Sequence, residues 1–515
     1  MRRFIQLLAC LLFLSINQRV SHVDAASSTL PAELVPYASA LRPGFERDLI
    51  AMADAPRYDI DLSIDPERRV ITGTQRVRYV NREAAPLDEL VLRLYPNTSY
   101  MSGGMVISDV IVDGRPVRVE PYRPDLFADS SAMRVSLATP LKPKQVLELR
   151  ASYLITAPLK SKTGYTTFGM IDGIFALPDA YAMVAARDNG HWLADPAPGF
   201  GDIVQSEMAL YRVTLHAPKD YVVVASGVCE PPPAPKGVKV APAPIPSPLG
   251  RGEGTLTCVA APARDFAAHL SHFYRELTSI APDALGNDVV VHSYFTALHQ
   301  RAGENALLYA AEALRTYERR FGPYPYRELK VFESPSIAGG IEYPISVGVN
   351  YSLYQQDGGY TEWVMAHEVA HQWWYGMVGS DPIREAWLDE AMAQFSASLY
   401  IEDRYGTVFA DAERQRFFID RYVAETKERG DTRAAQPTSA FYRWTYAPIV
   451  YGKAPLFFQD VRDAAGDARF ELWWRRYFQQ HRLGFAHAPD LLRAADEIGL
   501  GNIVRDAYTR RILSR

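Results

Sequence analysis

Two short motifs restrict how the second half of this chain can fold, because both carry side chains suited to one metal ion. The pentapeptide HEVAH occupies residues 367–371, and WLDE follows at residues 387–390. On a helix, His367 and His371 lie one turn apart on the same face, so both imidazoles can bind one cation. A third ligand has to come from another element, and Glu390 suits that position. The pattern therefore predicts two helices that face each other across a metal site.

The same motifs indicate a hydrolytic reaction. Glu368 lies about 100° around the helix from the first histidine, so it points beside the metal rather than at it. A carboxylate there can take a proton from a metal-bound water, while the fourth coordination position stays open. Two histidines and one glutamate are a ligand set of catalytic zinc, so we expect one Zn²⁺ per chain. The alternative, an amphipathic helix with two surface histidines, is disfavoured by the WLDE motif, which begins a second amphipathic stretch running to about Tyr405.

The N-terminal 25 residues have the pattern of a secretory signal peptide. Two arginines precede an apolar run over residues 4–16, and small residues suit cleavage after Ala25. This run is too short to span a bilayer, and no run of eighteen apolar residues occurs elsewhere. We therefore expect a periplasmic or secreted protein with no transmembrane segment in the mature chain. Lipoprotein processing at Cys10 is a less favoured alternative, because only six residues of the run would precede the cut.

The charge pattern argues against a polyanionic partner. Cleavage after Ala25 removes three arginines and one aspartate, which moves the formal net charge from −5 to −7. The chain has no run of Lys or Arg and no basic helical stripe, so we expect neither nucleic acid nor an anionic membrane surface as a partner. Oligomeric state is not readable from the sequence.

Cysteine content predicts a disulfide. Once Cys10 has left with the signal peptide, Cys229 and Cys258 are the only cysteines, and an oxidising compartment favours their pairing. Two buried free thiols remain the alternative, because sequence alone does not determine connectivity.

The first half of the chain reads as β-structure. From Arg57 to about Ala263, apolar and polar residues alternate with period two, and turn signals such as Asp65-Pro66 separate the runs. Residues 230–254 carry eight prolines and cannot contribute to a core. We predict an N-terminal β-rich domain over residues 26–286 with a proline-rich insertion between two of its strands.

The second half reads as mainly helical. Apolar residues recur at helical spacing from Leu307 to Phe321, and Gly322-Pro323 ends that helix. From Thr361 to the last residue the spacing is mostly helical. We predict a catalytic domain over residues 287–515, and hence an α+β protein of two domains.

Four local segments then occur in the order seen in a known enzyme family. They are FGPYPY at 321–326, GGIEYP at 339–344, HEVAHQWW with WLDEAMA, and VYGK at 450–453. In these segments the chain resembles the M1 family of zinc metallopeptidases, the gluzincin aminopeptidases that include leukotriene A4 hydrolase. The resemblance implies a saddle-like N-terminal antiparallel β domain and a mainly α, thermolysin-like zinc peptidase domain. It also implies no additional C-terminal helical domain, because the chain stops about 60 residues after Tyr451.

The resemblance assigns further site residues. Glu342, with Gly339 and Gly340 before it, corresponds to the family's anchor for the free α-amine of the substrate. Gly340, Ile341 and Tyr343 stand where Ala, Met and Asn are usual, so the detail of amine recognition differs. The family also implies a second acidic or amide side chain from the β domain, which we expect between residues 164 and 196.

Tyr451 corresponds to the tyrosine that donates a hydrogen bond to the oxyanion of the tetrahedral intermediate. Such a donor lowers the barrier because it faces charge that develops only in the transition state. Tyr446, five residues earlier, is the nearest competitor for this role.

The sequence thus leads to an exported aminopeptidase that acts on peptides with a free N-terminus. Two alternatives stay open. One is an endopeptidase or a hydrolase of a non-peptide substrate on the same zinc site. The other is a binding protein without catalysis, because fold and motif do not guarantee function.

Overall fold

The computed structural model describes residues 30–123, 130–159, 167–230, 253–282, 288–336 and 338–515. The predicted signal peptide at residues 1–25 and almost all of the predicted proline-rich insertion lie outside these ranges. Of the helices that the structure describes, none has the length and apolar character needed to cross a bilayer.

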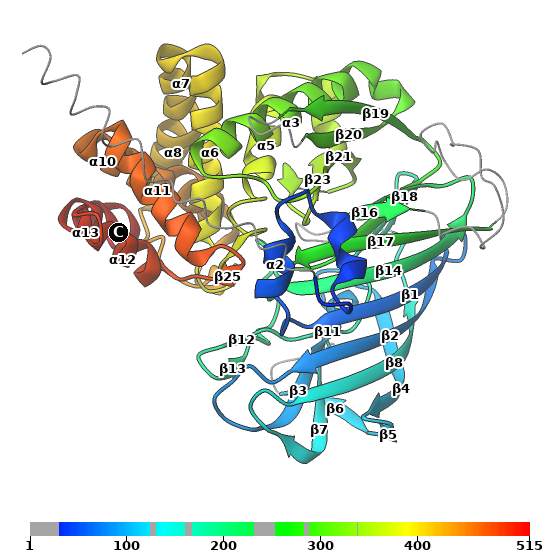
Figure 1. Ribbon diagram of the computed structural model, residues 1–515. Coiled ribbons are helices and arrows are strands. Elements are labelled where there is room, and N and C mark those ends of the chain that lie inside the picture. Colours follow the sequence, from blue (N-terminus) through cyan, green and yellow to red (C-terminus); the bar gives the residue numbers. More distant parts are fainter. Residues whose placement is uncertain (1–29, 124–129, 160–166, 231–252, 283–287, 337) are drawn as a thin grey trace, which may run out of the picture.

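An eight-stranded sheet forms most of the N-terminal domain, at the lower right of Figure 1. Burial alternates along β1 and β2, as the period-two pattern predicts, so one face packs inward. Neighbours are antiparallel, except that β1 and β14 run parallel. The strands in spatial order are β16 (Val228–Glu230), β17 (Glu253–Ala263), β14 (Ala209–Pro218), β1 (Arg57–Asp65), β2 (Val70–Val80), β8 (Val146–Thr156), β4 (Gly104–Val112) and β5 (Arg115–Pro116).

Smaller sheets complete the β-rich domain. One has the order β15 (Val222–Ala225), β18 (Ala267–Ser271), β10 (Ile174–Pro178) and β9 (Gly169–Ile171). Another has the order β11 (Met183–Val184), β3 (Leu87–Arg93), β7 (Ala132–Leu141) and β6 (Val119–Pro121). A two-stranded ribbon pairs β12 (Arg187–Asp188) with β13 (His191–Trp192).

The two strands that flank the proline-rich insertion pair with each other. Cys229 on β16 lies directly opposite Cys258 on β17, and their sulfur atoms are bonded. The insertion therefore joins two neighbouring strands of the eight-stranded sheet, as predicted, and the disulfide links the strands on either side of it.

A five-stranded mixed sheet begins the second domain. Its order is β19 (Tyr274–Ala281), β20 (Val289–Thr296), β21 (Glu328–Ser334), β23 (Ser346–Asn350) and β22 (Gly340–Ile341). The predicted boundary at residue 286 falls outside the described residues, but β19 precedes it and pairs with β20. The division therefore lies before Tyr274. The alternation of apolar and polar residues predicts a strand but not the sheet to which it belongs, because membership of a sheet depends on hydrogen bonds to other strands.

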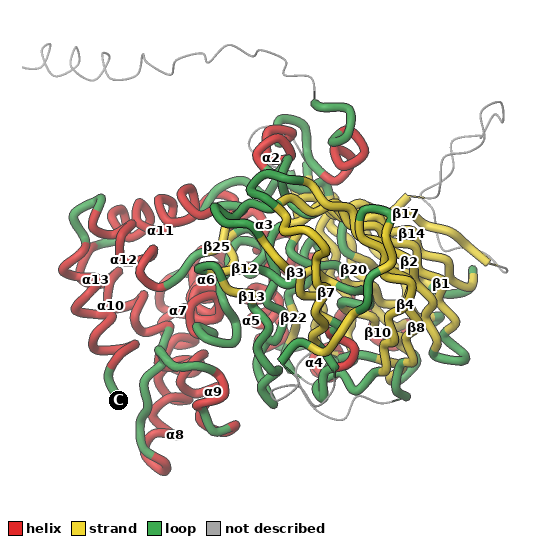
Figure 2. The backbone as a smooth tube through the Cα atoms, turned by 90° about the horizontal axis from the view of Figure 1, so that it is seen from below, coloured by secondary structure: helices red, strands yellow, loops and turns green. Residues whose placement is uncertain are grey.

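Helices pack on this sheet and extend away from the β-rich domain; Figure 2 shows strands and helices on opposite sides of the molecule. α3 (Gln300–Arg320) packs against β20 and α5 (Gly359–Ala370), and α5 packs against α6 (Trp387–Tyr405). α6 ends as predicted, because Gly406 has a φ of 88°. The other helices are α2 (Glu46–Ala51), α4 (Tyr351–Gln356), α7 (Thr407–Arg414), α8 (Arg421–Arg429), α9 (Arg443–Pro448), α10 (Pro455–Ala465), α11 (Asp467–His481), α12 (Ala488–Asp496) and α13 (Gly501–Tyr508).

Arginine side chains connect the two domains at several points. Arg42, before α2, pairs with Glu318 on α3 at 2.6 Å. Arg482, after α11, binds both carboxylate oxygens of Asp48 on α2 at 2.6 and 2.5 Å. The buried guanidinium of Arg264 donates hydrogen bonds to backbone carbonyls of the second domain. These contacts hold the β-rich domain in place beside the helices of the second domain.

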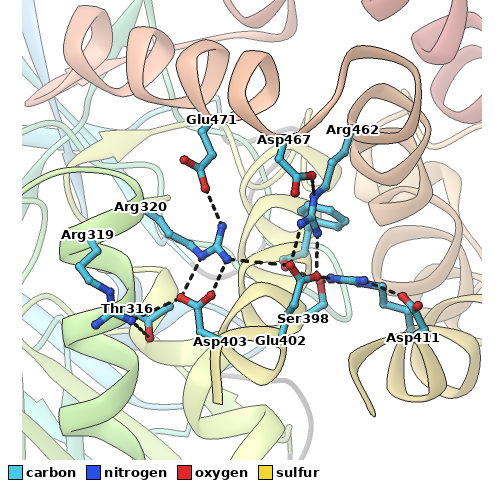
Figure 3. A network of polar contacts seen from close by, with 12 residues as sticks. Thr316, Arg319, Arg320, Ser398, Glu402, Asp403, Asp411, Arg462, Asp467 and Glu471 are labelled. Atoms are coloured by element: carbon cyan, nitrogen blue, oxygen red, sulfur yellow. Dashed lines mark hydrogen bonds and ion pairs between the residues drawn. The ribbon is translucent and has the colours of Figure 1, made fainter. Parts of the chain in front are cut away.

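Charged side chains join four helices around the C-terminal half of α6 (Figure 3). Glu402 accepts hydrogen bonds from Arg462 on α10 at 2.8 and 2.6 Å and from Arg414 on α7. The adjacent Asp403 accepts hydrogen bonds from Arg320 on α3. Burial raises the pKa of Glu402, but the hydrogen bonds from the two arginines outweigh burial and lower this pKa to about 2.

We expect Glu402→Gln to lower the free energy of unfolding by about 2–4 kcal/mol at pH 7, because two largely buried arginines lose their counter-charge. The folded pKa of Glu402 is depressed, so its stabilisation is present above the ordinary pKa of 4.5 and is lost as the pH falls toward 2. Urea unfolding at pH 7 and pH 3 measures this, and the difference between variant and natural protein should shrink at pH 3. Glu428→Gln, at an exposed position of α8, is the control; an equal loss there would contradict the role of Glu402.

Candidate metal centre and substrate cleft

α5 and α6 bring the two metal motifs together. His367 lies in the last turn of α5, and His371 caps that helix with helical backbone angles, φ −63° and ψ −14°. Glu390 lies in the first turn of α6. Trp363 on α5 donates a hydrogen bond from Nε1 to Oε1 of Gln394 on α6 at 3.1 Å, which ties the two helices together beside the site.

Three ligand atoms converge on one point. The Nε2 atoms of His367 and His371 are 3.1 Å apart, and Oε2 of Glu390 lies 3.2 Å from the first and 3.3 Å from the second. Zinc with bonds of about 2.0–2.1 Å in tetrahedral geometry separates its ligand atoms by about 3.3–3.4 Å. The residue types and their spacing therefore fit a zinc ion.

The imidazole of His371 is oriented by a backbone carbonyl. Its Nδ1 lies 2.8 Å from the carbonyl oxygen of Trp374, which can only accept a hydrogen bond. Nδ1 therefore carries the proton, and the lone pair of Nε2 is directed at the ligand atoms of His367 and Glu390. Hydrogen bonds of this kind fix the tautomer of metal-binding histidines.

Glu368 lies beside the three ligands, and the chain around Gly340 makes room for it. A Cβ atom at Gly340 would lie 2.4 Å from Oε1 of Glu368, so a side chain here would require the carboxylate to move. The carbonyl of Gly339 accepts a hydrogen bond from the backbone N–H of Asn350 at 2.9 Å. Gly340, at the start of the edge strand β22 (Gly340–Ile341), therefore lets the backbone approach the carboxylate closely.

Glu342 lies next to the metal site. One carboxylate oxygen of Glu342, one of Glu368 and one ring nitrogen of His371 all lie within 4.8 Å of one another. Burial raises the pKa of Glu342, and burial together with the charge of Glu342 raises the pKa of Glu368. Buried carboxylates this close to each other favour a bound cation.

Two aspartates of the β-rich domain lie near Glu342. Asp179 lies within the window expected for a second amine-binding side chain, and Asp202 lies six residues beyond it. Both line a small cavity together with Glu342, and Asp202 also lines the cleft that contains the metal ligands. Burial, and then the charges of Glu342 and Glu390, raise the pKa of Asp202. No sequence signal marks Asp202, because only the path of the loop between β13 and β14 brings it here.

Tyr451 is the tyrosine at the metal site. It lies in a π-helical turn, Ile449–Lys453, and its hydroxyl donates a hydrogen bond to Oε1 of Glu390. Its ring centroid is 5.8 Å from that of His367. The competitor Tyr446 is buried and packs against Phe200 with centroids 5.1 Å apart. Single π turns inside helices often occur at functional sites.

Residues 306–508 match the family model described as the Peptidase family M1 domain. This segment of the chain belongs to peptidase family M1. The resemblance in the sequence is thereby confirmed, and zinc is the metal that the family implies for the three ligands. The matched range includes both metal motifs, Glu342 and Tyr451.

Curated relatives match the chain over part of its length. Tricorn protease-interacting factor F2 of Thermoplasma acidophilum is 25% identical over 210 residues, which are 37% of this chain and 26% of that protein. Aminopeptidase 2 of Candida albicans is 24% identical over 243 residues, 44% of this chain and 26% of that protein. The chain thus spans about a quarter of the length of these relatives.

Solved structures share the fold over nearly the whole chain. An M1 zinc metallopeptidase from Deinococcus radiodurans has a TM-score of 0.63 and 18% identity, covering 89% of this chain and 94% of that one. A mutant two-domain M1 zinc metallopeptidase bound to L-tryptophan has a TM-score of 0.65 and 18% identity, covering 90% and 95%. This likeness confirms the predicted architecture of a β-rich domain followed by a helical domain.

Proposed function

We propose that this protein is a zinc-dependent aminopeptidase that hydrolyses the N-terminal peptide bond of peptides. The position of Glu342 carries the proposal, since its buried carboxylate lies beside Glu368 and His371. A substrate ammonium bound there forms a charge-assisted hydrogen bond and sets the first peptide bond over the metal site. Asp202 adds a second carboxylate at the same end of the cleft.

The residues of the site divide the chemistry among them. His367, His371 and Glu390 would hold zinc, which would supply a Lewis acid to polarise the scissile carbonyl and to acidify water. Glu368 accepts the proton of the attacking water and returns it to the leaving amine. The hydroxyl of Tyr451 donates a hydrogen bond to the carbonyl oxygen as negative charge develops there.

A blocked amine tests the aminopeptidase proposal. Acetylating the N-terminus of a peptide removes the charge that Glu342 would bind and adds bulk, so kcat/KM should fall by about a hundredfold or more. Glu342→Ala should narrow this gap, because it damages only substrates that use the carboxylate. The measurement is hydrolysis of a matched pair of free and N-acetylated peptides by natural and variant enzyme.

Two outcomes of this test favour other functions. Equal hydrolysis of free and blocked peptides would point to an endopeptidase on the same zinc site. Hydrolysis of neither peptide by a metal-loaded protein would point to a non-peptide substrate or to a binding protein.

We also propose that the enzyme acts outside the cytoplasm. The N-terminal signal pattern and the bond between Cys229 and Cys258 support this. N-terminal sequencing of the protein from its natural source should find Ala26 as the first residue, and a protein that starts at Met1 and remains in the cytosol would contradict export.

A further inference from the structure

Two arginines without an acidic partner among the described residues line the cleft that contains the three candidate metal ligands. The cleft has a volume of about 250 Å³, and both Arg421 and Arg443 contribute to its wall. Both are exposed, and neither forms an ion pair or a hydrogen bond with any residue in the part of the chain that the structure describes. Arg429, on the same helix as Arg421, does have an acidic partner, because it pairs with Glu425 at 2.9 Å. The cleft therefore has two cations whose charge the protein does not neutralise.

One of these arginines, Arg421, lies beside Tyr451, whereas Glu342 lies beside His371. Glu342 is close to His371, whereas Tyr451 is close to His367. Cζ of Arg421 lies 5.7 Å from the centroid of the Tyr451 ring. Arg421 therefore enters the cleft next to the proposed oxyanion donor Tyr451.

A short peptide has the complementary distribution of charge. If the proposed function holds, its ammonium lies at Glu342, its first carbonyl lies at the metal site, and its remaining residues extend toward Tyr451. Each residue of an extended chain advances about 3.3–3.6 Å, so the carboxylate of a tripeptide lies about 7 Å beyond the scissile carbonyl carbon. The ring centroids of His367 and Tyr451 are 5.8 Å apart, and Cζ of Arg421 lies 5.7 Å from the Tyr451 centroid. The guanidinium group of Arg421 is therefore within reach of the carboxylate of a tripeptide that begins at Glu342.

We propose that Arg421 and Arg443 bind a carboxylate on the leaving-group side of the substrate and that the enzyme therefore favours short peptides with a free C-terminus. Guanidinium groups suit this role because they bind carboxylates with two parallel hydrogen bonds. Contact with the Tyr451 ring accounts for the position of Arg421 but not for that of Arg443, which has no such contact among the described residues. This inference rests on the proposed function.

A pair of tripeptides tests the inference. Ala-Ala-Ala and its C-terminal amide share the free amine and differ only in the terminal charge. We expect kcat/KM to be about tenfold higher for the free acid, mainly through KM, because the contact is present in both ground and transition states. Raising the salt from about 0.01 M to about 1 M shortens the screening length from about 30 Å to about 3 Å and should reduce this ratio.

Variants assign the ratio to the two arginines. In the double variant Arg421→Gln with Arg443→Gln, the ratio of acid to amide should fall toward one. Both substrates depend on Tyr451 in the same way. Any effect of the substitutions on Tyr451 therefore cancels in the ratio of kcat/KM for the acid to kcat/KM for the amide. Arg416→Gln is the control, since Arg416 precedes the cleft residue Phe417, is exposed and does not line the cleft. This control should keep the tenfold ratio.

The substrate panel also separates two sources of the carboxylate. Ala-Asp-Ala-amide that is hydrolysed as fast as Ala-Ala-Ala would assign the arginines to an acidic side chain, whereas slow hydrolysis would assign them to the C-terminus. Equal rates for all three peptides in the natural enzyme, or a ratio unchanged in the double variant, would overturn the inference while leaving the aminopeptidase intact. Hydrolysis of none of them would instead count against the proposed function.

Discussion

Replacing Glu368 by glutamine should leave zinc bound and lower kcat by about 10³-fold. General bases contribute about 10²–10⁴-fold, and the amide keeps the shape of the side chain while removing its basicity. The carboxylate of Glu368 lies next to the metal ligands but provides none of the three ligand atoms, which are 3.1–3.3 Å apart. The variant should therefore keep its zinc. Single-turnover kinetics and elemental analysis of the same preparation measure the two effects together.

Stability provides a further check on Glu368→Gln. Burial raises the pKa of Glu368, so its negative charge costs free energy of folding near neutral pH in the metal-free protein. The variant should therefore unfold at the same temperature as the natural protein or above it, which excludes misfolding as the cause of lost activity.

Glu390→Gln is the matched control, because it makes the same chemical change at a ligand. We expect this variant to lose metal content, since a neutral amide is a poor substitute for a carboxylate on zinc. A fully active Glu368→Gln would mean that another group activates the water, and metal loss from Glu368→Gln equal to that from Glu390→Gln would reassign Glu368 as a ligand.

Replacing Tyr451 by phenylalanine should lower kcat by about 10²–10³-fold with little change in KM. Removal of one donor to a developing oxyanion has this magnitude, and an interaction made mainly in the transition state affects kcat rather than KM. The hydroxyl also donates to Glu390 in the structure, so zinc content is measured to separate loss of metal from loss of the donor. Steady-state kinetics with a free-amine tripeptide provides the two constants.

Tyr446→Phe is the control for this experiment. The ring centroid of Tyr446 lies 6.1 Å from that of Tyr451, but the Tyr446 ring packs against Phe200. We expect a change in kcat of no more than about threefold, within the range of small packing effects. An effect confined to KM in Tyr451→Phe would make Tyr451 a substrate-binding residue, and a larger kcat loss in Tyr446→Phe would transfer the role to that residue.

The side chains that we propose to bind the two charged ends of the substrate come from different parts of the chain. Glu342 follows a β-edge of the second domain, Asp202 comes from the β-rich domain, and the two arginines lie on α8 and α9. The arginines that connect the two domains, Arg42, Arg264 and Arg482, therefore also help to hold Asp202 beside the metal ligands. Substitutions that weaken the contacts between the two domains should change the preference for substrates with a free N-terminal amine before they change the zinc content.

The sequence by itself determined the parts of the site that are local. His367, Glu368 and His371 share one helical turn, so their relation follows from helix geometry, and the start of α6 at Trp387 places Glu390 in its first turn. The β-rich first half could also be predicted locally, from the period-two alternation of apolar and polar residues. A strand buries alternate residues whichever strand it pairs with.

Tertiary structure alone decided which distant segments meet. Strand pairing put β19 in the second domain, and the path of an irregular loop brought Asp202 to Glu342. The packing of α8 and α9 left Arg421 and Arg443 lining the cleft without acidic partners among the described residues. Such contacts depend on side chains far apart in the chain, and no periodicity in the sequence records them, because each segment satisfies its local pattern equally well in other arrangements.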